Sequence, residues 1–231
     1  MAEADWTVVT GSLASGSVRR GVTAGATPPA GGGTYVYGFN SIEATVGVVA
    51  LFCNLTDFAP TASGGSVRGA LKRGLSGGPT NFSVLLFGML QSNAYTANCY
   101  ALGLSDDNPS YISLVKGRLV DGIPSGPPGT LGVLARSVTT VANNVWSHLR
   151  LDVIANPSGD VVLNAYASDL ATNDVDSPSW VLIPGMSFVD DSLGVNSGSV
   201  PYTAGRWGYG FSSKDVTRRA FADQIELLRQ L

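Results

Sequence analysis

The chain has 231 residues, of which 44% are hydrophobic and only 13% are charged, and its formal net charge is −3. The apolar fraction suffices for a sizeable core. The negative net charge argues against the basic surface that a nucleic-acid-binding protein needs. No run of about 18 apolar residues is present that would span a membrane. The charged fraction is roughly half that of a typical globular protein, which predicts a largely uncharged surface that forms contacts.

The N-terminal segment begins MAEADW and lacks the basic and apolar stretches of a secretory signal, so we expect the protein to be made in the cytosol. Further along, Ala24–Thr34 reads AGATPPAGGGT, a composition typical of a loop. We therefore expect residues 1–34 to form a strand and an extended arm, and residues 35–231 to form a single domain.

Strand-like runs separated by Gly, Pro, Asn, Ser and Asp recur along the chain, and no segment shows a capped 3.6-residue period. The sequence therefore predicts an all-β protein. The predicted strands are Trp6–Val9, Val36–Phe39, Val46–Cys53, Val67–Arg73, Phe82–Phe87, Tyr100–Leu104, Tyr111–Val115, Leu131–Arg136, Val145–Ile154, Val161–Ala167, Trp180–Ile183, Gly205–Ser212 and Arg219–Leu228.

The clearest hairpin is VWSHLRLDVIANPSGDVVLNAY, with its turn at Asn156–Gly159. Odd-numbered residues from Val145 to Val153 are mostly apolar, whereas even-numbered residues from Trp146 to Asp152 are mostly polar. This alternation is typical of an antiparallel sheet with one buried face and one solvated face.

The last segment, RRAFADQIELLRQL, has the propensity of a short helix as well as the alternation of a strand. We favour a strand, because Trp207, Tyr209 and Phe211 just before it alternate with glycines. That alternation is typical of a central strand whose glycines admit a close neighbour.

Several connecting segments are long and rich in Gly, Pro and Ser, and such loops are often functional or ordered by a partner. They are Ala24–Thr34, Pro60–Ser66, Gly122–Thr130 and Val189–Thr203. The only cysteines, Cys53 and Cys99, lie in predicted strands. We expect two buried free thiols in a reducing compartment, with a disulfide between them as the alternative.

Four segments in order resemble the concanavalin A-like lectin/glucanase sandwich, a group that includes laminin G-like domains. They read CYALGLSDDNPSYISLVKGRL, VWSHLRLDVIANPSGDVVLNAY, GRWGYGFSS and RAFADQIEL, and the resemblance covers residues 80–231 well and residues 1–80 in outline. It implies an antiparallel two-sheet β-sandwich, the jelly roll, in a single domain with long loops.

The resemblance does not extend to catalysis. Members that hydrolyse β-glucans carry an E-x-D-x-E strand of paired carboxylates, whereas Glu3, Glu43 and Glu226 are the only glutamates here and none lies in such a strand. His148 is the only histidine and no acid in an orienting position is evident; the G-x-S-x-G match at Gly74–Gly78 is not followed by a helix. We therefore predict no catalytic residues and no enzymatic activity.

Two groups of aspartates suggest a metal. Asp106 and Asp107 precede Asn108, and Asp190–Asp191 form a second pair of loop carboxylates. Asp223 matches the last-strand aspartate that binds a structural calcium in some relatives. Calcium takes six to eight oxygen ligands, but turn-ordering aspartates have the same pattern. We favour turn ordering and expect no cofactor, with calcium at Asp106, Asp107 and Asp223 as the alternative.

Five aromatic residues are candidates for carbohydrate binding, because sugar rings pack on aromatic faces. They are Trp146, Tyr166, Trp180, Trp207 and Tyr209. The alternative is that these side chains fill the core or an interface.

A cytosolically made, lectin-like sandwich with few charges and no catalytic pair suggests a bacteriophage virion protein. Our leading hypothesis is a capsid decoration or tail-associated subunit, made in the host cytoplasm and located in the virion. Its expected partners are other virion proteins and further copies of itself as a homo-oligomer, and a host glycan in addition. A carbohydrate-binding module that recognises a cell-surface glycan is the alternative, and a glycoside hydrolase with an unrecognised site is the third hypothesis.

Overall fold

The structure is a computed structural model that describes residues 6–10, 18–21, 36–41, 47–53, 64–74, 82–92, 96–105, 107, 109–119, 123–124, 126–130, 132–168, 179–191, 200–213 and 218–229. These residues form fourteen strands and no α-helix, which confirms the all-β prediction. No helix in these ranges is long and apolar enough to cross a membrane.

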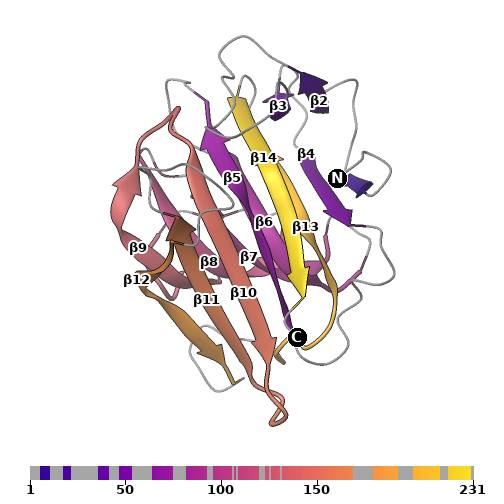
Figure 1. Cartoon of the computed structure of the whole chain (residues 1–231), viewed down its shortest axis with the longest axis vertical. Helices are drawn as coiled ribbons and strands as arrows, with labels where there is room; N and C mark the ends of the chain where they lie inside the picture. Colours follow the sequence, from indigo (N-terminus) through magenta and orange to yellow (C-terminus); the bar gives the residue numbers. More distant parts are fainter. Residues whose placement is uncertain are drawn as a thin grey trace.

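The strands are numbered in chain order, and Figure 1 labels β2 to β14. They are β1 (Trp6–Thr10), β2 (Val18–Gly21), β3 (Val36–Ser41), β4 (Gly47–Cys53), β5 (Gly65–Arg73), β6 (Phe82–Leu90), β7 (Asn98–Leu104), β8 (Ser110–Arg118), β9 (Val133–Val141), β10 (Ser147–Ala155), β11 (Val161–Ser168), β12 (Trp180–Asp190), β13 (Arg206–Ser213) and β14 (Arg218–Arg229).

The strands form two seven-stranded antiparallel sheets that face each other as a sandwich (Figure 1). Sheet A has the order β1-β4-β13-β6-β7-β8-β9, and sheet B has the order β12-β11-β10-β5-β14-β3-β2. This arrangement is consistent with a jelly roll and confirms the predicted fold class.

The core lies between the sheets and follows the two-residue period of the strands. Leu86 and Leu102 enter it from sheet A, and Leu149, Leu151 and Leu163 enter it from sheet B, all fully buried. Burial of each such side chain contributes about 2 kcal/mol. The apolar face predicted for the Val145–Tyr166 hairpin is confirmed within the two strands, but it was wrong for Val145, which precedes β10 and is exposed.

The opposite face of the same hairpin differs from the expectation. His148 and Asp152 point away from the core, yet both are buried. The Asp152 carboxylate accepts hydrogen bonds from the Ser66 hydroxyl and the Arg150 guanidinium, in place of the hydrogen bonds to water that an exposed carboxylate would make. The outer face of sheet B is thus partly covered rather than uniformly solvated.

The prediction of a central strand at Gly205–Ser212 is confirmed, because β13 pairs with both β4 and β6. The Trp207 ring is buried and rests on Gly88 of β6, where a Cβ atom would lie 2.7 Å from a ring carbon. The glycine that admits the indole ring is therefore on the neighbouring strand.

Strand β12 is longer than predicted. It continues through Pro184 and Gly185 to Asp190, and its pairing with β11 shifts register between Asn164 and Tyr166. Proline and glycine are tolerated there because β12 is an edge strand with an irregular segment. The ambiguous C-terminal segment is strand β14 and not a helix. The short strand β2 was not predicted.

A second apolar cluster covers the outer face of sheet A over β6, β7, β8 and the start of β9. Leu119 and Ile123, which follow β8, pack with Phe87, Cys99 and Val115 of the sheet. Cys99 is a free thiol, as expected, and burial raises its pKa to about 12; the side chain of Cys53 lies outside the described residues. This cluster covers part of the outer face of sheet A. The outer face of sheet B carries a row of polar and aromatic side chains and is the candidate for a binding surface.

Candidate functional site

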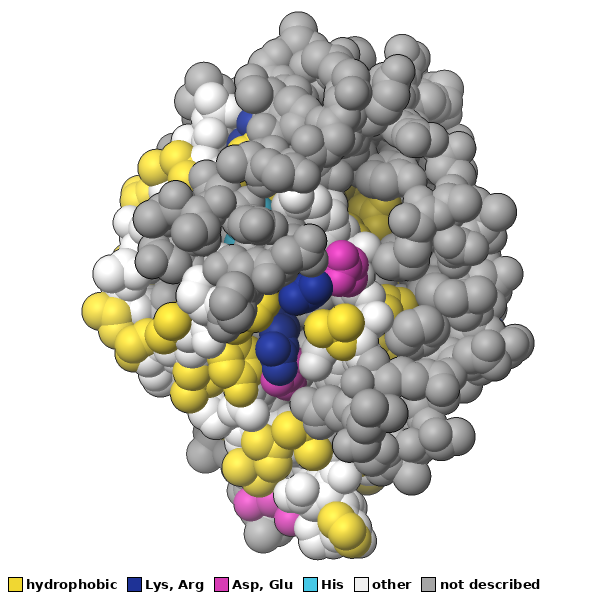
Figure 2. Space-filling view, in the orientation of Figure 1, with side chains coloured by type: hydrophobic (Ala, Val, Ile, Leu, Met, Phe, Trp, Pro, Cys, Tyr) yellow, Lys and Arg dark blue, Asp and Glu magenta, His cyan; other side chains and the backbone are white. Residues whose placement is uncertain are grey.

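Five side chains lie in register across five neighbouring strands on the outer face of sheet B. We call this set the cross-strand row: Leu182 of β12, Tyr166 of β11, Arg150 of β10, Arg68 of β5 and Glu226 of β14. Because adjacent strands lie about 4.8 Å apart, the row spans roughly 19 Å. Figure 2 shows side chains of Lys or Arg and of Asp or Glu close together near the middle of this face.

Arg150 is fixed by a buried carboxylate and an aromatic ring. Its Nε and Nη2 atoms donate to Asp152 Oδ1 and Oδ2 at 2.7 and 2.6 Å, and its guanidinium lies 4.9 Å from the centre of the Tyr166 ring. Ser66 Oγ donates to Asp152 Oδ1 at 2.6 Å. The hydrogen bonds to Asp152 raise the pKa of Arg150, so its charge is permanent.

These contacts leave the guanidinium more accessible than the carboxylate. The Arg150 side chain is 26% exposed, whereas that of Asp152 is 3% exposed. The arrangement therefore presents the donor groups of Arg150 to solvent and hides the acid that orients them.

In the second ion pair of the row, the acid and not the arginine is the more exposed partner. Arg68 donates through Nε and Nη2 to Glu226 Oε2, at 3.1 and 2.7 Å. Here the carboxylate is the more accessible partner, with Glu226 40% exposed and Arg68 15% exposed. Glu226 therefore presents an acceptor group at the β14 end of the row.

A third cation lies further along β5. Lys72 is buried, with its ammonium 4.8 Å from the Trp146 ring centre and 5.1 Å from that of Phe221. Burial lowers the pKa of Lys72. Cation–π contacts of this kind hold the two rings in place.

The structure separates the five aromatic candidates. Tyr166 belongs to the cross-strand row, and Trp146 packs on Phe221 over sheet B. Trp180 begins β12, is half-buried and pairs with Ser168, beside the row. Trp207 and Tyr209 are buried in the core between the sheets, where the alternative interpretation placed them.

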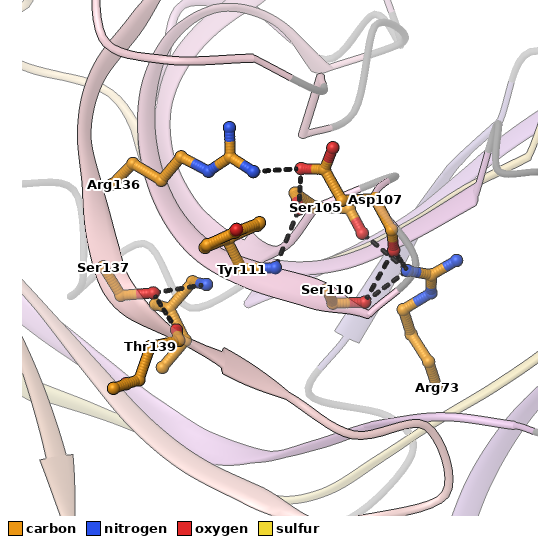
Figure 3. Close-up of polar contacts among 9 residues, drawn as sticks. Arg73, Ser105, Asp107, Ser110, Tyr111, Arg136, Ser137 and Thr139 are labelled. Carbon is orange, nitrogen blue, oxygen red and sulfur yellow. Dashed lines mark hydrogen bonds and ion pairs between the residues drawn. The ribbon is translucent and has the colours of Figure 1, made fainter.

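The loop that contains Asp107 is organised by two arginines (Figure 3). Asp107 Oδ2 accepts hydrogen bonds from Ser105 Oγ and from Arg136 Nη2, both at 2.8 Å. Arg73 Nη1 donates to the main-chain oxygens of Ser105 and Asp107, both at 2.7 Å, and to the Ser110 hydroxyl. The oxygens of this loop are therefore directed at guanidinium groups.

This geometry favours turn ordering over calcium binding at Asp107. Asp106 and the side chain of Asp223 lie outside the described residues, and no cluster of three or more His, Cys, Asp or Glu that could hold a metal is found in the described part of the chain. Asp190 is a partner of Lys116 inside the protein and not a loop ligand.

No family model matches the chain, and no curated protein matches it in sequence. Solved structures do match. The carbohydrate recognition domain of Emp47p has a TM-score of 0.55 at 9% identity, covering 98% of this chain and 89% of that one. Carbohydrate-binding module CBM66 from Bacillus subtilis has a TM-score of 0.52 at 12% identity, covering 97% and 96%. The cellulose-induced protein Cip1 has a TM-score of 0.56 at 12% identity, covering 100% and 94%.

The chain has the fold of these domains. Its resemblance to concanavalin A-like jelly rolls is thereby confirmed as a similarity of fold. At such low identity the likeness carries no residue-level correspondence, so the site is argued from this structure alone.

Of the row, only Tyr166 was singled out from the sequence. Arg68 and Glu226 are 158 positions apart and meet only because β14 pairs with β5. The signal available in the sequence was the polar alternation of β5, in which Arg68 and Lys72 occupy the outward positions.

Proposed function

We propose that the protein is a carbohydrate-binding, lectin-like module and that the cross-strand row is its glycan-binding surface. The observation that carries this proposal is the open row itself, in which a tyrosine ring and two oriented ion pairs lie side by side on a sheet face. Sugar hydroxyls need fixed donors and acceptors, and the C–H faces of sugar rings pack on apolar and aromatic surface. The fold shared with carbohydrate-recognition domains supports the same proposal.

The site is pre-organised for a ligand. Asp152 and Ser66 hold Arg150 over Tyr166 through hydrogen bonds of 2.6 to 2.7 Å. A side chain that is already ordered loses little entropy when a ligand binds. Binding would therefore retain most of the energy of the new hydrogen bonds.

We propose binding without catalysis. Glycoside hydrolysis needs two accessible carboxyl groups about 5–10 Å apart, one of which protonates the leaving oxygen. Both oxygens of Asp152 already accept hydrogen bonds and its side chain is nearly inaccessible. Of the two carboxylates paired with arginines on this face, only Glu226 is open to a ligand.

Replacing Tyr166 with alanine is expected to weaken glycan binding at least tenfold, because the sugar loses its ring contact and Arg150 loses the surface on which it stacks. A glycan array would identify ligands of the whole chain, and titration calorimetry would then compare the variants. Tyr111→Ala is the matched control, since Tyr111 lies under Arg136 in a similar stack, 3.5 Å from ring centre to guanidinium, on sheet A. Equal losses in both variants, or no glycan bound by the native chain, would refute the proposal.

A structural role in an assembly, as a phage capsid decoration or tail-associated subunit, is the second candidate. It is favoured by exposed apolar side chains on edge strand β12, where Val181, Leu182 and Val189 are 62%, 42% and 51% exposed. Exposed apolar side chains on an unpaired sheet edge are available for contact with a partner. Light scattering over a concentration series tests this role. A multimer, or a monomer that binds to preassembled capsid or tail particles, would support it. A stable monomer that does not bind such particles would count against it.

A further inference from the structure

We infer that the ligand of the cross-strand row is an uncharged oligosaccharide that lies across the strands of sheet B. This inference rests on the proposed function and adds the charge, the minimum length and the direction of the ligand. Three observations lead to it: the charge balance of the row, the groups that its ion pairs leave unused, and their separation.

The row is electrically balanced. Arg150 and Arg68 carry two positive charges, and Asp152 and Glu226 carry two negative charges in direct contact with them. An acidic sugar would have to bind beside both carboxylates or displace them, and like charges at an interface are costly. Lys72 does not offset this cost, because it is buried and lies about 13 Å further along β5 than Arg68.

The hydrogen-bonding groups that the two ion pairs leave unused match the donors and acceptors of sugar hydroxyls. Among the described residues, Arg150 Nη1 and the Tyr166 hydroxyl have no hydrogen-bond partner, and neither has Glu226 Oε1. Arg150 can only donate and Glu226 can only accept, whereas a sugar hydroxyl does both. An uncharged polyol therefore satisfies both ends of the row without a change in protonation.

The two ends are too far apart for one sugar ring. Arg150 and Glu226 are separated by two strand spacings, about 10 Å, and Tyr166 and Glu226 by three, about 14 Å. Leu182 extends the row beyond Tyr166 with exposed apolar surface. A ligand that reaches from Glu226 to Leu182 must contain several sugars and run perpendicular to the strands.

Titration calorimetry of the whole chain tests the inference with neutral gluco-, manno- and xylo-oligosaccharides and with oligogalacturonides of the same lengths. We expect a neutral series to bind, with affinity rising at least tenfold from monosaccharide to tetrasaccharide. We expect the dissociation constant to change less than about twofold between low and high salt, because screening affects charged partners. Tighter binding of oligogalacturonides with strong salt dependence would overturn the charge assignment, and equal binding of monosaccharide and tetrasaccharide would overturn the cross-strand direction. If no sugar of either kind binds, the proposed function itself fails.

Glu226→Gln provides a second, independent readout. It retains an acceptor oxygen but removes the negative charge that is paired with Arg68, so oligogalacturonide affinity should rise about tenfold as the net charge of the row becomes more positive. Asp191→Asn is the matched control, since it makes the same change in net charge at an exposed position beyond the row. An oligogalacturonide affinity unchanged in Glu226→Gln, with its melting temperature retained, would refute the charge-balance argument.

Discussion

Replacing Asp190 with asparagine is expected to destabilise the protein by about 3–5 kcal/mol, because the change breaks a fully buried ion pair by removing its negative charge. Lys116 Nζ lies 2.6 Å from Asp190 Oδ2, and the two side chains are 2% and 0% exposed. For a chain of this size the loss corresponds to a melting temperature lower by about 10 °C. Thermal unfolding followed by circular dichroism, together with denaturant titration, would measure it.

The side chains around the Lys116–Asp190 pair are closely packed, so we expect little rearrangement that would compensate for the lost ion pair. Tyr100 donates its hydroxyl hydrogen to Asp190 Oδ2 at 2.5 Å and accepts a hydrogen bond from the Tyr202 main-chain nitrogen at 2.9 Å. The Tyr100 and Tyr202 rings are 5.1 Å apart, and the Lys116 ammonium lies 5.0 Å from the Tyr202 ring centre. Asp190 Oδ1 has no partner in the described part of the chain, so an asparagine amide placed there would add an unsatisfied donor.

The double variant Lys116→Met with Asp190→Asn isolates the charge effect. It removes both charges and keeps an acceptor for the Tyr100 hydroxyl, so the part of the loss caused by the broken ion pair should return, while the cost of the unsatisfied asparagine donor remains. Asp191→Asn, at the exposed neighbouring position, should change stability by no more than about 1 kcal/mol, the range of exposed polar contacts. Additive losses in the double variant would show that the two side chains are not coupled.

This ion pair shows where sequence reasoning falls short. Asp190 was grouped with Asp191 as a loop carboxylate, whereas it is the last residue of strand β12. Lys116, however, occupies an inward position after Ile112 and Leu114, which both contribute to the core. A lysine at an inward position of a strand is a signal that a buried acid is nearby, and the sequence contained it.

The fold was predicted well where a two-residue period alone decides the structure. The β10–β11 hairpin turns at Asn156–Gly159, and its odd-numbered apolar residues in Leu149–Val153 and Val161–Ala165 are buried as expected. The period gives the faces of a strand, but it does not give the order of strands in a sheet. The contact of Arg68 with Glu226 depends on β5 lying between β10 and β14, and that order is fixed by packing across the whole sandwich.

Residue type alone was a weaker guide to the site. Trp207 and Tyr209 were grouped with Tyr166 because all three are aromatic, yet the first two face the core. Leu119 and Ile123 cover part of the outer face of sheet A, and no local sequence pattern predicts which part of a sheet a following segment will cover.

Replacing Gly103 with alanine is expected to cost about 3 kcal/mol, the upper range for overpacking a core. Gly103 lies in the interior strand β7, opposite Leu85 of β6 and Ser113 of β8. A Cβ atom there would lie 2.2 Å from the Val84 carbonyl oxygen and 2.7 Å from Leu85 Cα. Both are backbone atoms of a paired strand, so relief requires β6 and β7 to separate and weakens their hydrogen bonds. Denaturant titration would measure the loss as a lower midpoint with an unchanged slope.

Gly117→Ala, on the adjacent strand β8, is the matched control. Gly117 pairs with Cys99, and a Cβ atom at its position would meet nothing within 4 Å. Because alanine restricts the unfolded chain more than glycine does, this variant should be neutral or more stable by up to about 1 kcal/mol. In the sequence the two glycines are indistinguishable, since each interrupts a strand between larger residues. Opposite effects of the same substitution on two paired strands would therefore test the register of β6, β7 and β8, and equal effects would show that the close approach at Gly103 is not made.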